Sequence, residues 1–81
     1  MIPPRIKGVK PLDNFCLEIT YVTGEKKIYD MKKNLNYNCY KNLKNINYFK
    51  LAKSAETTVE WPEGEDIDPN EIYDNSVTIK E

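Results

Sequence analysis

Six acidic residues follow one another at short intervals in the C-terminal part of the sequence, and of all segments this one most resembles a metal site. Carboxylate oxygens are the ligands that Ca²⁺ prefers, but this run lacks the ligand spacing of a calcium-binding EF-hand loop and places Gly64 at the wrong position. We therefore expect no metal site here. The six residues are Glu63, Glu65, Asp66, Asp68, Glu71 and Asp74.

The two cysteines, Cys16 and Cys39, are too few and too far apart for a zinc site, and the chain has no histidine to complete one. A redox switch is the alternative. Cys16, however, falls on the polar face of an expected strand, with no histidine or helix N-terminus beside it to lower its pKa. We expect two ordinary reduced thiols, as in cytoplasmic proteins.

Tyrosines and lysines interleave across residues Lys26–Lys53, as they do in single-strand nucleic-acid binders, where bases stack on aromatic rings over a basic groove. Tyrosine at strand positions more often packs half-buried, and the net charge of the whole chain is −1. The alternative hypothesis is a stand-alone regulatory or sensory domain that binds a small ligand or nucleic acid through this Lys/Tyr face. Of the two, nucleic acid is not the partner we expect.

Nothing in the sequence is typical of an enzyme. There is no Ser or Cys nucleophile beside a base and no carboxylate pair on rigid elements. We expect no catalytic residues and no cofactor. No apolar run approaches ~18 residues and the opening Met1-Ile2-Pro3-Pro4 is no signal peptide, so we expect no membrane span and a cytoplasmic protein.

Charge is divided unevenly along the chain. Residues 1–54 carry eleven Lys/Arg against four Asp/Glu, a net charge of +7, and residues 55–81 carry one Lys against nine Asp/Glu, a net charge of −8. The two halves either attract each other within the fold or offer opposite faces to partners. Together with the small size, this asymmetry predicts a protein partner or a weak homodimer whose affinity falls as salt rises.

A helix is expected to begin after Asp68, and several residues set its start. Asp68 is an N-cap residue, Pro69 occupies the first helical position, and Glu71 completes a capping box. Ile67 and Ile72 form a hydrophobic staple across the cap. The expected helix spans roughly residues 69–75. Trp61, which precedes it, is expected to be buried at the join between the preceding strand and this helix.

The N-terminal third predicts three strands. Residues 5–12 read as an edge strand interrupted by Gly8, and residues 15–21 alternate, placing Phe15, Leu17, Ile19 and Tyr21 on one face. A type I turn with Gly24 as the bulge residue then leads into residues 26–31, because a type I′ turn would need positive φ at Thr23. This register places Tyr29 and Met31, rather than Ile28, on the face of Leu17.

The rest of the chain predicts short elements. Residues 32–50 are rich in Asn and Tyr and read as one or two short helices that depend on packing. Residues 49–54 and 57–61 read as a second hairpin. The tail, Ser76–Glu81, is either a last strand or a frayed end. We predict one domain over residues 1–81, of class α+β, with two small antiparallel β units and short helices in the order three strands, helices, two strands, helix.

A resemblance to a known family follows from these segments. The chain resembles the bacterial family called domain of unknown function 2442 over nearly its whole length, and the most specific part is the run from Trp61 to Tyr73. Thr23 departs from the Asn that usually precedes the Gly, and Ile72 from the common Leu. The resemblance rests on Arg5-Ile6-Lys7-Gly8-Val9-Lys10-Pro11-Leu12, Leu17, Gly24-Glu25-Lys26, Tyr29-Asp30, Leu43 and Phe49, and on the motif residues Trp61, Pro62, Gly64, Asp66, Ile67, Asp68, Pro69, Glu71, Ile72 and Tyr73.

The resemblance implies a small α+β domain without an established activity. Family members are found alone, fused to a helix-turn-helix domain, or encoded beside another small protein in arrangements resembling toxin–antitoxin pairs. This chain ends at Glu81, before a helix-turn-helix would begin. The leading hypothesis is therefore a non-enzymatic protein-interaction module, an accessory or antitoxin-like partner of a neighbouring small protein.

Overall fold

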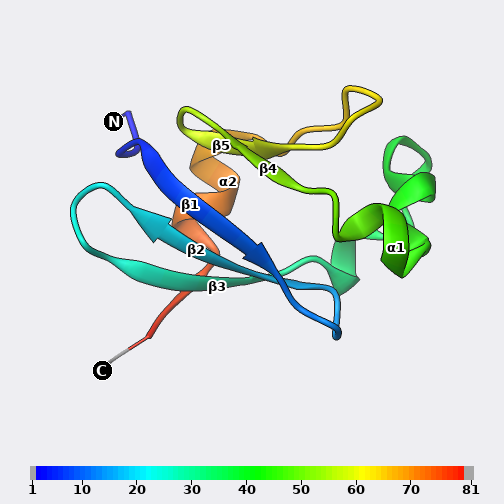
Figure 1. Cartoon of the computed structure of the whole chain (residues 1–81), viewed down its shortest axis with the longest axis horizontal. Helices are drawn as coiled ribbons and strands as arrows, with labels where there is room; N and C mark the ends of the chain where they lie inside the picture. The colour runs from blue at the N-terminus through cyan, green and yellow to red at the C-terminus, as the bar shows by residue number, and fades with distance from the viewer. Residues whose placement is uncertain (1, 80–81) are drawn as a thin grey trace.

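Two small antiparallel sheets and four short helical segments make up the fold. The computed structural model describes residues 2–79. Strands β1 (Ile6–Pro11), β2 (Cys16–Tyr21) and β3 (Lys26–Asp30) form a meander that β6 (Val77–Thr78) extends, in the order β1-β2-β3-β6 (Figure 1). Strands β4 (Lys53–Ala55) and β5 (Thr58–Glu60) form the second sheet. The α+β class predicted from the sequence is thus confirmed.

Four helical segments connect and cover the sheets. Lys32–Asn34 (η1) and Asn38–Lys44 (η2) are 3₁₀ turns, Ile46–Phe49 (α1) is a single α-helical turn, and Pro69–Asp74 (α2) is the capped helix. The expected one or two helices over residues 32–50 are therefore three short pieces, mostly 3₁₀. Asn is a weak helix former, and 3₁₀ geometry is used in such short runs. None of the helices within residues 2–79 has the length and apolar character needed to cross a membrane.

The turn between β2 and β3 sets the register of the main sheet. Gly24 has φ +95°, its N–H donates to the Tyr21 carbonyl at 2.9 Å, and the Tyr21 N–H donates to the Glu25 carbonyl at 2.9 Å. This is the predicted type I turn with a glycine bulge. Leu17 consequently lies opposite Tyr29, as predicted.

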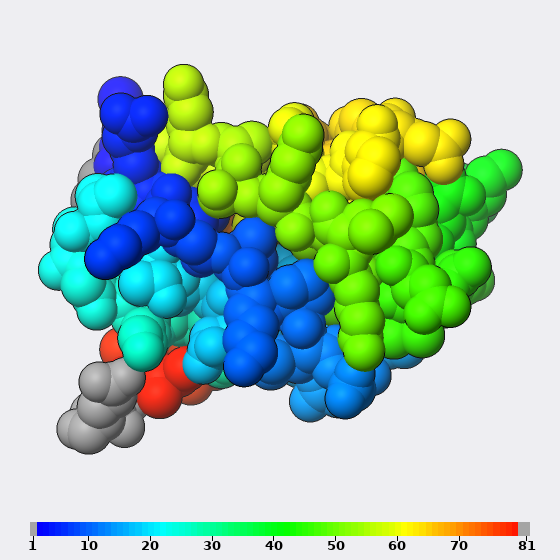
Figure 2. All heavy atoms as spheres, viewed as in Figure 1, coloured from blue at the N-terminus to red at the C-terminus, as the bar shows by residue number. Residues whose placement is uncertain are grey.

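The main sheet has one covered face and one open face. The covered face packs against α2, which passes behind the sheet in Figure 1, and the second hairpin lies alongside β1. On the open face, the pairings Lys10–Glu18, Glu18–Ile28 and Ile28–Val77 place four side chains in one row. Figure 2 looks onto this side of the molecule. The buried side chains of the covered face are Leu17, Ile19, Tyr21, Tyr29 and Met31.

The start of β2 differs from the prediction. Phe15 has φ +61° and precedes the strand, although its ring still packs edge-on against Phe49 at 5.3 Å between centroids. Cys16, expected on a polar face, is buried. It lies where the chain leaves the turn before β2: its N–H donates to Asn14 Oδ1 and the Leu12 N–H donates to its carbonyl.

The second hairpin begins later than expected. Phe49 belongs to α1, not to a strand, and the hairpin turns through Glu56, which has φ +56°. The Glu56 carbonyl accepts a hydrogen bond of 2.6 Å from the Ile6 N–H of β1. The expected edge strand, β1, therefore lies beside the second hairpin. The tail forms β6 up to Thr78, and its last residues, Lys80 and Glu81, lie outside the described part of the chain.

Candidate functional site

The loop from Trp61 to Asp68 joins β5 to α2 and contains most of the motif. Trp61 is buried as predicted; its Nε1 donates to the Phe49 carbonyl at 2.9 Å. The Gly64 N–H donates to the Trp61 carbonyl at 2.9 Å, and Gly64 has φ +99°, a conformation that favours glycine. Asp66 then forms an isolated bridge to Glu60 of β5, so the loop returns along the hairpin.

Side chains from the Asn- and Tyr-rich segment hold this loop in place. Tyr48 donates to Glu65 Oε1 at 2.6 Å and accepts from the Glu63 N–H at 2.9 Å. Asn42 donates to Glu65 Oε2 at 3.1 Å, and Tyr40 donates to the Asp66 carbonyl at 2.8 Å. In Figure 2 the loop, in yellow, rests directly on the green helical segment. The polar character of residues 32–50 thus serves to fix the loop.

Only half of the predicted capping box forms at the start of α2, namely the half in which the Asp68 side chain accepts from helix N–H groups. Asp68 Oδ1 accepts from the N–H groups of Asn70 at 2.8 Å and of Glu71 at 3.3 Å, and Pro69 opens the helix. Ile67 and Ile72 are both buried, as the staple requires. The prediction that the Glu71 side chain bonds back to the Asp68 N–H is wrong, because the Glu71 carboxylate contacts Tyr29, Lys33 and Asn75 instead.

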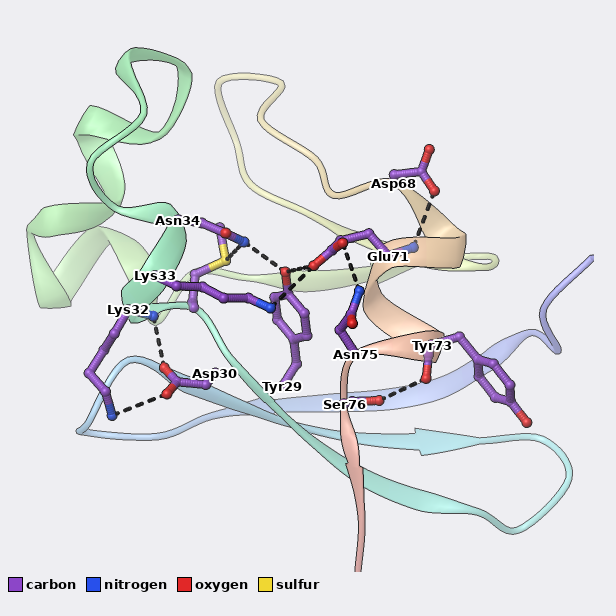
Figure 3. A network of polar contacts seen from close by, with 11 residues as sticks. Tyr29, Asp30, Lys32, Lys33, Asn34, Asp68, Glu71, Tyr73, Asn75 and Ser76 are labelled. Carbon is purple, nitrogen blue, oxygen red and sulfur yellow. Dashed lines mark hydrogen bonds and ion pairs between the residues drawn. The ribbon is translucent and has the colours of Figure 1, made fainter.

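Glu71 instead links α2 to β3 and η1 (Figure 3). Its Oε2 accepts from the Tyr29 hydroxyl at 2.8 Å and lies 3.4 Å from Lys33 Nζ, and its Oε1 accepts from Asn75 at 2.8 Å. The buried Asn34 in turn donates to the Tyr29 oxygen at 2.7 Å. The hydrogen bond from Tyr29 holds the pKa of Glu71 below its ordinary value, while burial raises the pKa of Tyr29.

Three open hollows follow the seam between residues 33–48 and residues 63–71. Their volumes are about 380, 410 and 340 Å³. Tyr40 lines the first two and Glu63 the last two, so the hollows adjoin one another. The first lies over the Glu71 network, and the second borders Cys39 and Gly64.

The seam is acidic on one wall and aromatic on the other. The acidic wall consists of Glu63, Glu65, Asp66, Asp68 and Glu71. The opposite wall carries Tyr37, with 61% of its surface exposed, Tyr40 and Tyr48, together with Lys33 and Lys41. Acceptor oxygens and aromatic faces suit hydrogen-bond donors and cations. Within residues 2–79, no grouping of three or more His, Cys, Asp or Glu is arranged to hold a metal ion.

The other candidate residues lie apart from the seam or in the core. Both cysteines are free; Cys39 is exposed, and burial raises the pKa of the Cys16 thiol. Tyr73, the last motif residue, stacks its ring under Lys27 Nζ at 3.8 Å and donates to Glu25. Pro62 is exposed at the loop turn.

Part of the interleaved segment gathers along the seam, where Lys33 and Lys41 line the hollows with Tyr37, Tyr40 and Tyr48. Of its other residues, Tyr29 is buried, Lys32 pairs with Asp30, and Lys50 pairs with Asp13. The charge asymmetry is partly internal, since Lys33–Glu71 and Lys53–Glu60 join the two halves.

The interleaved segment 26–53 included Lys33, Tyr37 and Tyr40 of the other wall, but sequence reasoning missed Asn34 and did not place any of the four beside the acidic loop. Their signal was the density of Asn and Tyr in a segment with weak helix propensity. That signal indicates that these side chains form hydrogen bonds to other parts of the fold, but it does not identify their partners.

The fold and the seam define a small α+β domain built around a capped loop-and-helix motif. Residues 6–78 match the family described as Protein of unknown function (DUF2442), and the chain belongs to this family. No curated protein and no solved structure matches the chain.

Proposed function

We propose that this protein is a non-enzymatic interaction module that binds another protein along the seam between residues 33–48 and residues 63–71. The observation that carries the proposal is the run of three adjoining hollows on that seam. Such a run gives an extended, rather than a deep and closed, binding surface, which suits a segment of another protein.

The seam is also held in shape before any partner arrives. Tyr40, Tyr48 and Asn42 tie one wall to the other through hydrogen bonds. A surface ordered in advance loses less conformational entropy on binding. Tyr37, by contrast, projects with 61% exposure and offers a large aromatic contact, of the kind enriched in binding hot spots.

The chemistry of the lining supports recognition more than catalysis. Carboxylates, phenols and amides line the hollows, and several already hold hydrogen bonds to the fold. Some members of this family are encoded beside another small protein in arrangements resembling toxin–antitoxin pairs, so a small protein encoded beside this one would be the first partner to test. In this role the protein is an accessory or antitoxin-like partner.

The test is calorimetric titration of this protein with the product of the neighbouring gene. Wild type is expected to bind, and Tyr37→Ala is expected to weaken binding by about tenfold, as loss of a hot-spot tyrosine does. Val77→Ala removes an equally exposed apolar side chain from the open sheet face and is the matched control. Absence of binding, or sensitivity to Val77→Ala alone, would contradict the proposal.

A further inference from the structure

The first hollow contains a buried polar side chain with an unused acceptor. Asn34 has 9% of its surface exposed and lines the hollow. The Tyr29 hydroxyl has one hydrogen, which it donates to the Glu71 carboxylate, so the Asn34 atom 2.7 Å from the Tyr29 oxygen must be the amide nitrogen. The Asn34 carbonyl oxygen is therefore the other atom, and no residue described in the structure donates to it.

Asp68 adds a second unused acceptor to the same hollow. Its Oδ1 caps α2, but its Oδ2 receives no hydrogen bond or ion pair from residues 2–79. Lys33 is the one cation among the described lining residues, and its Nζ lies 3.4 Å from Glu71. The lining of the hollow thus carries two carboxylates against one ammonium group.

Aromatic rings complete the hollow. Tyr37 is largely exposed and Tyr40 is partly buried, with its hydroxyl already donated to the Asp66 carbonyl. A planar guanidinium group matches this setting, because it has donors only, carries a positive charge, and stacks on aromatic faces. An anionic group would meet Asp68 and Glu71 with Lys33 alone to offset them.

We propose that this hollow receives an arginine side chain of the partner protein, with Asn34 and Asp68 accepting its hydrogen bonds and Tyr37 stacking on it. This inference rests on the proposed function and names the chemistry of the partner at one point of the seam. It predicts that the partner segment is basic.

The experiment uses a short synthetic peptide, acetyl-Gly-Gly-Arg-Gly-Gly-amide, and its citrulline analogue, which has nearly the same shape without the charge. Each is titrated into the 81-residue protein, and the NMR shifts of the Asn34 side-chain amide are followed. The arginine peptide is expected to give saturable shifts, and the citrulline peptide at least about tenfold weaker binding. Equal binding of the two peptides would overturn the inference.

Two variants of equal charge change locate the site. Asp68→Asn removes the charge but keeps a residue that caps helices well, so the fold is retained. It is expected to weaken arginine binding by about tenfold. Glu18→Gln makes the same change on the open sheet face and is expected to leave binding unchanged. Loss of binding in both variants, or in neither, would count against the hollow.

The outcome also separates this inference from the proposed function. If the neighbouring protein binds in a manner sensitive to Tyr37→Ala but not to Asp68→Asn, the proposed function stands and the arginine site is wrong. If the arginine peptide binds but the neighbouring protein does not, the assignment to a protein partner is overturned.

Discussion

The Tyr29 hydroxyl on β3 donates a hydrogen bond of 2.8 Å to the Glu71 carboxylate on α2. Asn34 of η1 donates to the same Tyr29 oxygen, so one phenol joins the sheet, the 3₁₀ segment and the capped helix. Because Asn34 and Glu71 also line the first hollow, the contacts that assemble the fold also shape the proposed binding surface.

The two buried tyrosines of the meander are expected to respond oppositely to loss of the hydroxyl. Tyr29→Phe removes the hydroxyl that accepts from the Asn34 amide and donates to Glu71, and it is expected to lower the free energy of unfolding by about 1–3 kcal/mol. The Tyr21 hydroxyl is buried with no hydrogen-bond partner in the described structure. Tyr21→Phe is therefore expected to be neutral or stabilising. Urea unfolding of both variants measures these changes in the free energy of unfolding. A larger decrease for Tyr21→Phe than for Tyr29→Phe would contradict the role given to the Tyr29–Glu71–Asn34 network.

Glu71 is expected to make stability depend on pH in the acid range. The hydrogen bond from Tyr29 lowers its pKa below the ordinary value of 4.5, against the opposing effect of partial burial. Since the unfolded chain binds this proton more readily, the contribution is complete above pH 4.5 and is lost as pH falls through the lower, folded-state pKa. Glu71→Gln is expected to flatten the acid side of the stability profile. An unchanged slope below that pH would argue against this network.

The N-cap of α2 is expected to contribute about 1 kcal/mol. Asp68→Ala removes the acceptor for two helix N–H groups and should lower the melting temperature, whereas Asp68→Asn should nearly retain it. Thermal melts followed by circular dichroism compare the two. Equal losses would show that the charge of Asp68, and not its cap, stabilises the helix.

We also expect the protein to form a weak homodimer, in which a second copy of the chain binds at the seam. Arg5, just before β1, and Lys7 and Lys10 on β1 are exposed and form no ion pair with residues 2–79, whereas five carboxylates line the seam. In a two-fold symmetric dimer, the basic strand of each protomer can face the acidic seam of its partner. Sedimentation velocity should show dimer at low salt and monomer at about 0.5 M salt, where charges are screened. A strict monomer at high protein concentration and low salt would remove the homodimer.

Local signals in the sequence predicted much of the fold. The Asp68 cap, the Gly24 bulge and the alternation in β2 depend on residues a few positions apart, and physical rules for them apply directly. The 3₁₀ form of residues 32–44 and the late start of β4 were missed, because weak propensities leave such short elements to tertiary packing.

The second wall of the site was not predictable in the same way. The bonds from Tyr29 to Glu71 and from Tyr40 to Asp66 span 42 and 26 residues. Periodicity and capping describe neighbours along the chain and cannot pair such residues. The burial of Cys16 was not predictable either, since alternation along the strand places this position on a polar face.

Hydrogen–deuterium exchange of this protein, alone and mixed with the product of the neighbouring gene, tests the central claim most directly. The seam hypothesis predicts slower exchange on binding in residues 33–48 and 63–71, with the open face of β1, β2, β3 and β6 unchanged. Protection confined to that open sheet face, or no protection at saturating partner, would contradict it.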